Sequence, residues 1–306
     1  MSGLHAARLT GRGIVALGPV AGAPDGDETA KAFLQGLVTA DMDDLSPGGA
    51  VNSALLTPQG KIAYEFVIHA RPGGAYLLDT PAGMVAELAK RLMFYRLRAK
   101  IDIAARDDLA VVAIWGAAGS ESPDSPGIVA DPRWAGLGWR AVVPESEADA
   151  ILARFMPADE AAYEAHRIGI GVAELGRDYA PGEVFPHEAG LDQLRGVAFD
   201  KGCYVGQEVV SRMHHCGTAR SRFVPVAIAG PAPAPGTPVE IDGKASGTFG
   251  SSAGAGGIAL IRLDRLADAL VDGALPRGAV SSGGAALIPL RPAWAGFAWP
   301  GEDKGK

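Results

Sequence analysis

The chain has 306 residues, more than a single domain usually contains, so we expect two or three domains with substantial cores. Hydrophobic residues make up 48% of the chain and the formal net charge is −7, which gives no general attraction to nucleic acid. The absence of a long apolar run or a signal pattern, and the presence of only two cysteines, predict a cytoplasmic protein in a reducing compartment.

The first hundred residues read as one α+β unit. Apolar periodicity predicts a strand at 11–17, a helix at 28–38, strands at 51–57, 61–70 and 75–79, a helix at 82–97 and a strand at 99–104. A turn, Thr57-Pro58-Gln59-Gly60, joins two of these strands, because proline presets one backbone angle and glycine supplies another. The order βαββ(β)αβ is close to a ferredoxin-like unit.

A second α+β pattern follows. The elements expected here are strands at 109–115 and 137–143 and helices at 145–156 and 158–168. The stretch from Arg177 to Arg195 is irregular and rich in glycine, proline and charge, and a long ordered loop of this kind is often functional. From Phe223 onward, short strands at 239–241, 246–249 and 257–261 alternate with turn residues. This third pattern predicts a small β-barrel or sandwich.

The loop leads into Asp-Lys-Gly-Cys-Tyr-Val-Gly-Gln-Glu (200–208), which combines a thiol, a cation and two glycines. Cysteine reacts and binds metals as the thiolate, which a cation such as Lys201 or a helix N-terminus favours. Gly202 and Gly206 allow backbone angles that a side chain would forbid, so the thiol of Cys203 can sit on a tight, open loop. The alternative is an ordinary packed cysteine.

This segment resembles the signature Lys-Gly-Cys-Tyr/Phe-x-Gly-Gln-Glu of the YgfZ family. The matching residues are Lys201, Gly202, Cys203, Tyr204, Gly206, Gln207 and Glu208. Family members are folate-binding proteins of iron–sulfur cluster assembly and repair, and distant relatives of the glycine cleavage T-protein, an aminomethyltransferase. The resemblance extends upstream through residues 35–41, 55–62 and 95–100.

The resemblance implies a T-protein-like fold, with two ferredoxin-like α+β domains and a C-terminal barrel arranged in a ring around a cavity. The first strand would then belong to the domain that resumes near residue 107. The expected domains are 1–24 with 107–222, which carries the cysteine motif, then 25–106, and finally 223–306.

The resemblance also implies that tetrahydrofolate or a derivative is bound. A folate site must satisfy the donor edge of the pterin, usually with a carboxylate, and enclose its flat ring with apolar groups. Glu188, within Pro-His-Glu-Ala-Gly-Leu (186–191), is similar in context to the pterin-binding glutamate of T-proteins. A solvated loop carboxylate is the alternative. Arg96, Arg98 and Arg167 are candidates to meet the negative tail of the folate.

A metal site made of Cys203, His214, His215 and Cys216 is a further hypothesis, because thiolate and imidazole bind zinc and iron. Their spacing matches no compact ligand pattern, and two cysteines cannot supply a four-cysteine cluster site. We expect no permanent metal. A transient cluster contact at Cys203, shared with a second chain or a small thiol, stays open.

The competing hypothesis is a folate-dependent aminomethyltransferase, in which a precisely placed aspartate orients the reacting groups. The acidic pair that follows the hairpin turn in T-proteins falls near Tyr64 and Glu65 here, so the aspartate is missing. A glutamate, one methylene longer, would displace the carboxylate by about 1 Å. T-proteins also lack the Lys-Gly-Cys signature.

We therefore predict a non-enzymatic or weakly catalytic accessory factor that binds tetrahydrofolate and supports assembly or repair of [4Fe-4S] clusters in client enzymes. Cys203 would contact a cluster or client thiol, Lys201 would favour its thiolate, and Gln207 and Glu208 would fix the loop. The expected partners are folate and iron–sulfur client or assembly proteins, with no membrane and no sequence-specific nucleic acid. A pure interaction scaffold is a third hypothesis.

Overall fold

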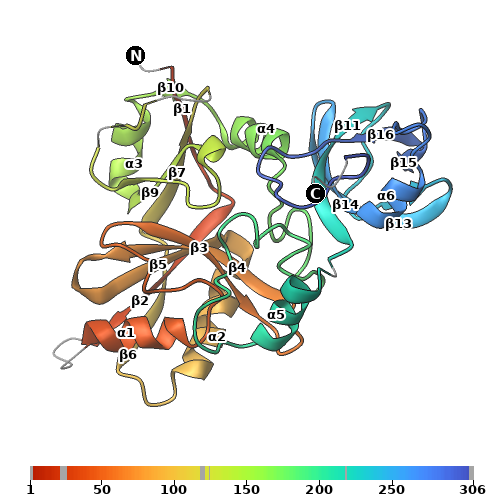
Figure 1. Cartoon of the computed structure of the whole chain (residues 1–306). Helices are drawn as coiled ribbons and strands as arrows, with labels where there is room; N and C mark the ends of the chain where they lie inside the picture. Colours follow the sequence, from red (N-terminus) through yellow and green to blue (C-terminus); the bar gives the residue numbers. More distant parts are fainter. Residues whose placement is uncertain (1–2, 21–25, 118–120, 124, 218, 303–306) are drawn as a thin grey trace. The chain divides into compact units, whose positions relative to one another are not determined.

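The computed structural model describes residues 3–20, 26–117, 121–123, 125–217 and 219–302 (Figure 1). The chain divides into two compact units. The first contains the residues up to 163 together with 194–207, and the second contains 164–193 and the residues from 208 onward. Within the described ranges, no helix is long and apolar enough to cross a membrane.

The first unit contains an antiparallel five-stranded sheet in the order β3-β4-β5-β2-β6. Its elements are β2 (Arg12–Pro19), α1 (Gly26–Gln35), β3 (Ala50–Leu56), β4 (Ile62–Arg71), β5 (Ala75–Pro81), α2 (Val85–Arg96) and β6 (Ile101–Arg106). Their order along the chain is βαβββαβ, which confirms the predicted βαββ(β)αβ pattern with the strand in parentheses present.

Both faces of this sheet are apolar. Successive side chains of a strand point to opposite sides, so neighbouring apolar residues enter two different cores. On β2, Val15 and Leu17 belong to the core that also contains Leu34 of α1 and Leu88 of α2. The intervening Ile14 belongs to a different core, shared with the second sheet of the unit. The two helices therefore cover one face, and the other sheet covers the opposite face (Figure 1).

The second sheet has the order β10-β1-β7-β9-β8. Its strands are β1 (His5–Arg8), β7 (Leu109–Trp115), β8 (Ile128–Ala130), β9 (Trp139–Pro144) and β10 (Met156–Pro157), accompanied by α3 (Glu145–Leu152), and α4 (Glu160–Ile170) follows.

The first two strands of the chain belong to different sheets. The strand expected at 11–17 forms as β2 and pairs with β5 and β6, whereas the preceding β1 pairs with β7. The chain thus passes from one sheet to the other within Leu9–Gly11. The βαββ(β)αβ pattern had placed this strand with residues 25–106, whereas the resemblance implied that the first strand belongs to the domain that resumes near residue 107.

A buried ion network lies between the two sheets. Asp79 of β5 accepts hydrogen bonds from Arg12 at 2.7 Å and Arg140 at 2.5 Å, and Asp131 accepts one from Arg133 at 2.7 Å. Burial alone would raise the pKa of Asp79, but the guanidinium groups of Arg12 and Arg140 hold it below its usual range. Each buried charge of this network has an opposite charge beside it, and removing one partner would leave a buried charge uncompensated.

The second unit is built around a closed barrel in the order β11-β14-β13-β12-β15-β16. Its elements are α5 (Gln207–Cys216), which begins at the unit boundary, β11 (Ser221–Ala229), β12 (Pro238–Ile241), β13 (Lys244–Ala253), β14 (Gly256–Arg262), α6 (Leu263–Asp268), β15 (Val280–Ser282) and β16 (Ala285–Pro289). The predicted barrel is confirmed.

The sequence predicted β12, β13 and β14 and missed the other three strands. The strand β11 contains Pro225, a residue that usually argues against a strand inside a sheet. The strand β15 is only three residues long, too short for its alternation to stand out. Closure of the barrel supplies the partners that local sequence does not reveal.

Candidate functional site

The segment that leads to the cysteine loop is fastened to the first unit. Ala198 donates its backbone N–H to the carbonyl of Thr39 at 2.9 Å, and the Thr39 hydroxyl donates to the carbonyl of Gly196 at 2.6 Å. The amide of Asn52 on β3 donates to the carbonyl of Leu194 at 3.1 Å. The resemblance implied that the motif belongs to the domain of 107–222, but its observed contacts run to residues within 25–106.

Lys201 is buried and supports this attachment. Its ammonium donates to the carbonyl oxygens of Val38 at 2.9 Å and Ala40 at 2.6 Å. Burial lowers the pKa of Lys201 to about 8, and the nearby carboxylates of Asp41 and Asp43 oppose that shift. The observed contacts of Lys201 make it an anchor of the loop. An action on the thiol of Cys203 belongs to the proposal below.

The next residues alternate between the interior and solvent. Tyr204 is buried, its ring centroid lies 5.3 Å from the ammonium nitrogen of Lys201, and burial raises the pKa of its phenol to about 12. Gly202 and Cys203 are exposed. The two inward side chains hold the loop at both sides of the cysteine, so Cys203 is presented to solvent.

Gly206 brings the loop against the hairpin turn between β3 and β4. Its φ is +80°, and a Cβ added there would lie 2.6 Å from the carbonyl oxygen of Thr57 and 3.0 Å from the Cα of Gly60. Both the backbone angle and the close approach require glycine. Gly202 has no atom within 4 Å of such a Cβ, so the two glycines of the motif are not equivalent.

The motif ends in the first turn of α5, four residues after the cysteine. Gln207 donates its side-chain amide to the carbonyl of Lys201 at 3.4 Å, so it contacts the loop as expected. Glu208 is exposed and forms an ion pair with Arg212 of the same helix at 2.7 Å. Fixing of the loop by Glu208 stays a prediction.

Two stretches that carried the family resemblance therefore meet at the cysteine loop. Residues 35–41 supply the carbonyls and hydroxyl that hold it, and residues 55–62 supply the turn on which Gly206 lies. Sequence reasoning missed Thr39 and Asn52 as supports of the loop. The only sequence signal for Thr39 was that it lies within residues 35–41, which resemble the family. Short polar side chains such as Thr39 and Asn52 form no periodic pattern that would indicate a support of the loop.

Glu188, in the second unit, is half-buried within a tight turn. Its carboxylate accepts the backbone N–H of Phe185 at 2.9 Å, and its carbonyl accepts the N–H of Phe223 at 2.8 Å. Glu188 therefore stabilises its own turn and joins that turn to β11. A role toward a pterin stays a prediction.

His187, the residue before Glu188, lines a pocket of about 590 Å³ in the second unit. Its aromatic and charged lining includes His187, Asp192, His214, Arg220, Arg222, Phe297 and Trp299.

A buried ion pair lies in the lining of this pocket. Arg222 donates to the carboxylate of Asp192 at 2.6 and 3.0 Å, and its guanidinium carbon lies 4.6 Å from the ring centre of Phe297. Burial lowers the pKa of His187 to about 4, so this imidazole is neutral at pH 7. The pocket has the size and the ring-lined walls of a small-molecule site.

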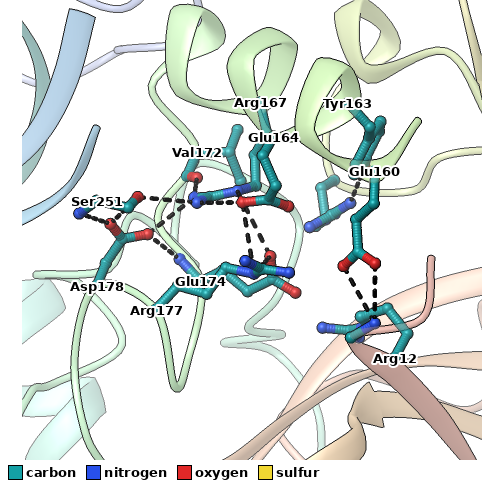
Figure 2. A network of polar contacts seen from close by, with 12 residues as sticks. Arg12, Glu160, Tyr163, Glu164, Arg167, Val172, Glu174, Arg177, Asp178 and Ser251 are labelled. Atoms are coloured by element: carbon teal, nitrogen blue, oxygen red, sulfur yellow. Dashed lines mark hydrogen bonds and ion pairs between the residues drawn. The ribbon is translucent and has the colours of Figure 1, made fainter. Parts of the chain in front are cut away.

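The structure gives Arg167 a role other than the one expected. This side chain is fully buried on α4, and its five N–H groups are engaged (Figure 2). They donate to Glu164 twice, at 3.0 and 2.8 Å, to Asp178 at 2.8 Å, to Ser251 at 3.0 Å and to the carbonyl of Val172 at 2.6 Å. No N–H group is left for the tail of a folate, so Arg167 is a structural residue. Helical spacing could not reveal this burial.

The other two arginines lie in the first unit. Arg96 ends α2 and donates to the carbonyl of Ile101 at 3.3 Å, and Arg98 follows two residues later. Both are exposed.

The histidines near Cys216 do not assemble a metal site. The rings of His214 and His215 lie 5.6 Å apart, and Cys216 is free and exposed. Among the residues that the structure describes, no three His, Cys, Asp or Glu side chains are grouped so that they could hold a metal ion.

At the hairpin, the position of the missing aspartate is buried. Tyr64 and Glu65 lie in β4 and are 8% and 6% exposed. The carbonyl of Glu65 accepts the hydroxyl of Thr80 at 2.9 Å.

Comparisons with known proteins agree with this architecture. The aminomethyltransferase T of the glycine cleavage system from Bartonella henselae superimposes with a TM-score of 0.73 over 97% of this chain and 88% of its own, at 15% identity. The model of the CAF17 C-terminal β-barrel domain matches residues 220–297. The chain therefore has the fold of the glycine cleavage T-protein class with a CAF17-type barrel.

Sequence relatives narrow this class. The mitochondrial iron–sulfur cluster assembly factor IBA57 of Mus musculus is 31% identical over 287 residues, which cover 85% of this chain and 78% of the relative. The Homo sapiens protein is 31% identical over 306 residues, covering 90% and 82%. The chain belongs to the IBA57 family of iron–sulfur cluster assembly factors. The resemblance seen in the cysteine motif is confirmed at this family level.

Proposed function

We propose that this protein is a tetrahydrofolate-binding accessory factor of YgfZ type that supports assembly or repair of [4Fe-4S] clusters in client enzymes. Its working group is the thiol of Cys203. The observation that carries the proposal is the exposure of this thiol on a loop whose neighbours, Lys201, Tyr204 and Gly206, are all fixed against the first unit.

The chemistry of one thiol limits what the loop can do. A thiolate is a good ligand for iron in a cluster, and an exposed loop can reach a cluster carried by another protein. One cysteine supplies one ligand, and the described residues hold no group of three metal-binding side chains. We therefore propose that the thiolate of Cys203 makes a transient contact with an iron–sulfur cluster or with a client thiol, and that the partner supplies the remaining cluster ligands.

For the thiolate, the proposal includes an influence of Lys201. Its ammonium is held two residues from Cys203 and its burial leaves it weakly solvated, so its field is less screened than that of a surface lysine. Gln207 would keep the backbone of Lys201 in place through its hydrogen bond.

The folate part of the proposal rests on the second unit. Glu188 is the proposed partner of the pterin's donor edge. The adjacent pocket fits such a ligand in volume and in its walls of Phe297, Trp299 and neutral His187, and the cation of Arg220 suits a carboxylate. A role of the exposed Arg96 and Arg98 toward a folate tail stays a prediction of the resemblance.

We expect a reducing compartment, with the cytoplasm as the proposed one, because both cysteines are free and exposed. The names of the relatives place those proteins in mitochondria.

Replacing Cys203 tests the proposed chemistry. In cells that lack their own factor, the wild type should restore the activity of a [4Fe-4S] enzyme, and Cys203→Ala should abolish this rescue without lowering the melting temperature. The matched control is Cys216→Ala, the second exposed cysteine, which should rescue fully. Full rescue by Cys203→Ala would discard the cysteine mechanism.

Folate binding is tested on the purified protein. Tetrahydrofolate should raise the melting temperature, because a ligand that binds only the native state stabilises it by mass action, and Glu188→Gln should reduce the rise. No shift at any concentration contradicts the folate proposal and favours a scaffold. Formation of methylene-tetrahydrofolate from an aminomethyl donor would instead establish the transferase.

A further inference from the structure

Helix α2 carries apolar side chains on two opposite faces. On one face, Leu88 and Leu92 are buried against the sheet of the first unit. On the other, Met93 is 47% exposed, Phe94 is 74% exposed and Leu97, directly after the helix, is 86% exposed. Three of the eight large hydrophobic side chains that are exposed within the described residues thus fall in one turn and a half. Such clustering, unlike a single exposed leucine, requires an explanation.

Leu97 is also held in an unusual backbone conformation. Its φ is +45° and its ψ −106°, in the half of backbone space that favours glycine. A non-glycine residue held there costs about 1–3 kcal/mol, and strain of this kind gathers at functional positions. Because the side chain of Leu97 is almost fully exposed, burial within this chain does not offset that cost.

Basic residues surround the apolar side chains. Residues 90–100 contain five cations and no acid: Lys90, Arg91, Arg96, Arg98 and Lys100. All five are exposed, and none forms an ion pair within the part of the chain that the structure describes. The whole chain has a net charge of −7, so this concentration of positive charge is local. We call these five residues, together with Met93, Phe94 and Leu97, the outer α2 surface.

The composition of the outer α2 surface favours a protein over other macromolecules. Phenylalanine, methionine and arginine are the side chains enriched at the centres of protein interfaces. The binding of a helix to a membrane surface strengthens with the apolar area that it buries, and three side chains offer little such area. Single-stranded nucleic acid stacks on several aromatic rings, and here Phe94 is the one exposed aromatic side chain of the surface.

We propose that the outer α2 surface is a docking site for a protein partner that presents an acidic amphipathic segment. Its apolar side chains would cover Phe94 and Leu97, and its carboxylates would meet Arg96, Arg98 and the lysines. The surface requires neither folate nor Cys203. Only the nature of the partner, a protein of cluster assembly, rests on the proposed function.

A synthetic peptide probes this chemistry directly. We use a fluorescein-labelled helical peptide with leucine and phenylalanine on one face and glutamate elsewhere, and an otherwise identical peptide with lysine in place of glutamate. Fluorescence anisotropy should show binding of the acidic peptide alone, weakened by salt. Phe94→Asp should weaken it by about tenfold or more, as expected for a central interface residue.

Two further variants sharpen the peptide experiment. Arg96→Glu combined with Arg98→Glu should reverse the preference, so that the lysine peptide binds better. Ile288→Asp, which adds the same charge at another exposed hydrophobic residue (56% exposed), should leave binding unchanged. Absence of binding, indifference to Phe94→Asp, or tighter binding to phosphatidylglycerol vesicles or single-stranded RNA would overturn the proposal.

Rescue of a [4Fe-4S] enzyme in cells connects the surface to function. Phe94→Asp and Leu97→Asp should rescue poorly although their melting temperatures match the wild type, whereas Ile288→Asp should rescue normally. Full rescue by both α2 variants overturns the docking site. A wild type that fails to rescue contradicts the proposed function instead, and the peptide measurement still decides the surface.

Discussion

The two glycines of the cysteine motif illustrate how differently one residue type can act within five positions. Gly206 has a positive φ and approaches the hairpin turn closely, whereas Gly202 has open space around it. From the sequence, both were interpreted as conformational hinges, because glycine alone does not state which of its properties is used.

Alanine at each glycine separates these roles. Gly206→Ala should lower the free energy of unfolding by about 2–3 kcal/mol, because the new Cβ is strained at φ +80° and lies 2.6 Å from the carbonyl oxygen of Thr57. Gly202→Ala should change it little. Urea denaturation of both variants measures the difference, and equal losses would show that the loop does not lie on the hairpin turn in solution.

At the scale of elements, the buried hydrogen-bond network around Arg167 of α4 could not be predicted from the pattern of the sequence. Arg167 in the last turn of the helix joins Asp178 of the following turn and Ser251 of β13 (Figure 2). Asp178 accepts three further hydrogen bonds, from the N–H of Glu174 and from the N–H and hydroxyl of Ser251. These hydrogen bonds connect the irregular segment that contains Asp178 to strand β13 of the barrel, within the second unit.

Disrupting the network around Arg167 should therefore destabilise the second unit. Asp178→Ala removes one of the three carboxylates that pair with the buried guanidinium of Arg167. It also leaves the N–H groups of Glu174 and Ser251 without their acceptor, so the loss should be about 3 kcal/mol. The control is Arg212→Gln, which removes the exposed pair with Glu208 and should not measurably alter stability. Guanidinium denaturation compares the two, and a loss for Asp178→Ala no larger than the control's would contradict the role given to this network.

For the molecule as a whole, two buried histidines couple stability to pH. His69 lies in the first unit and His187 in the second, and burial lowers the pKa of each to about 4. In the unfolded chain a histidine has a pKa of about 6.5. Between these values the unfolded chain binds protons that the folded chain does not, so the free energy of unfolding falls as the pH decreases.

We expect this loss to begin near pH 6.5 and to continue to about pH 4. For His69 it should reach about 3 kcal/mol, since one pKa unit corresponds to roughly 1.4 kcal/mol. Urea denaturation at several pH values between 7.5 and 4.5 measures the slope, and His69→Gln should flatten it. An unchanged slope in His69→Gln combined with His187→Gln would assign the acid sensitivity to other groups.

The sequence by itself determined most elements of the α+β units, except the short strands β1, β8 and β10, as well as the position of the barrel and the cysteine motif. These features depend on local periodicity, on turn residues such as Pro58 and Gly60, and on contiguous residues. Each can be read within a short window.

Only the tertiary structure decided which groups meet. It paired β2 with β5 and β6, buried Arg167, turned Lys201 toward the carbonyls of Val38 and Ala40, and left Phe94 and Leu97 uncovered. A charged or apolar side chain has the same letter in the sequence whether it is exposed or buried. Its environment depends on chain segments distant in the sequence, and local patterns carry no information about them.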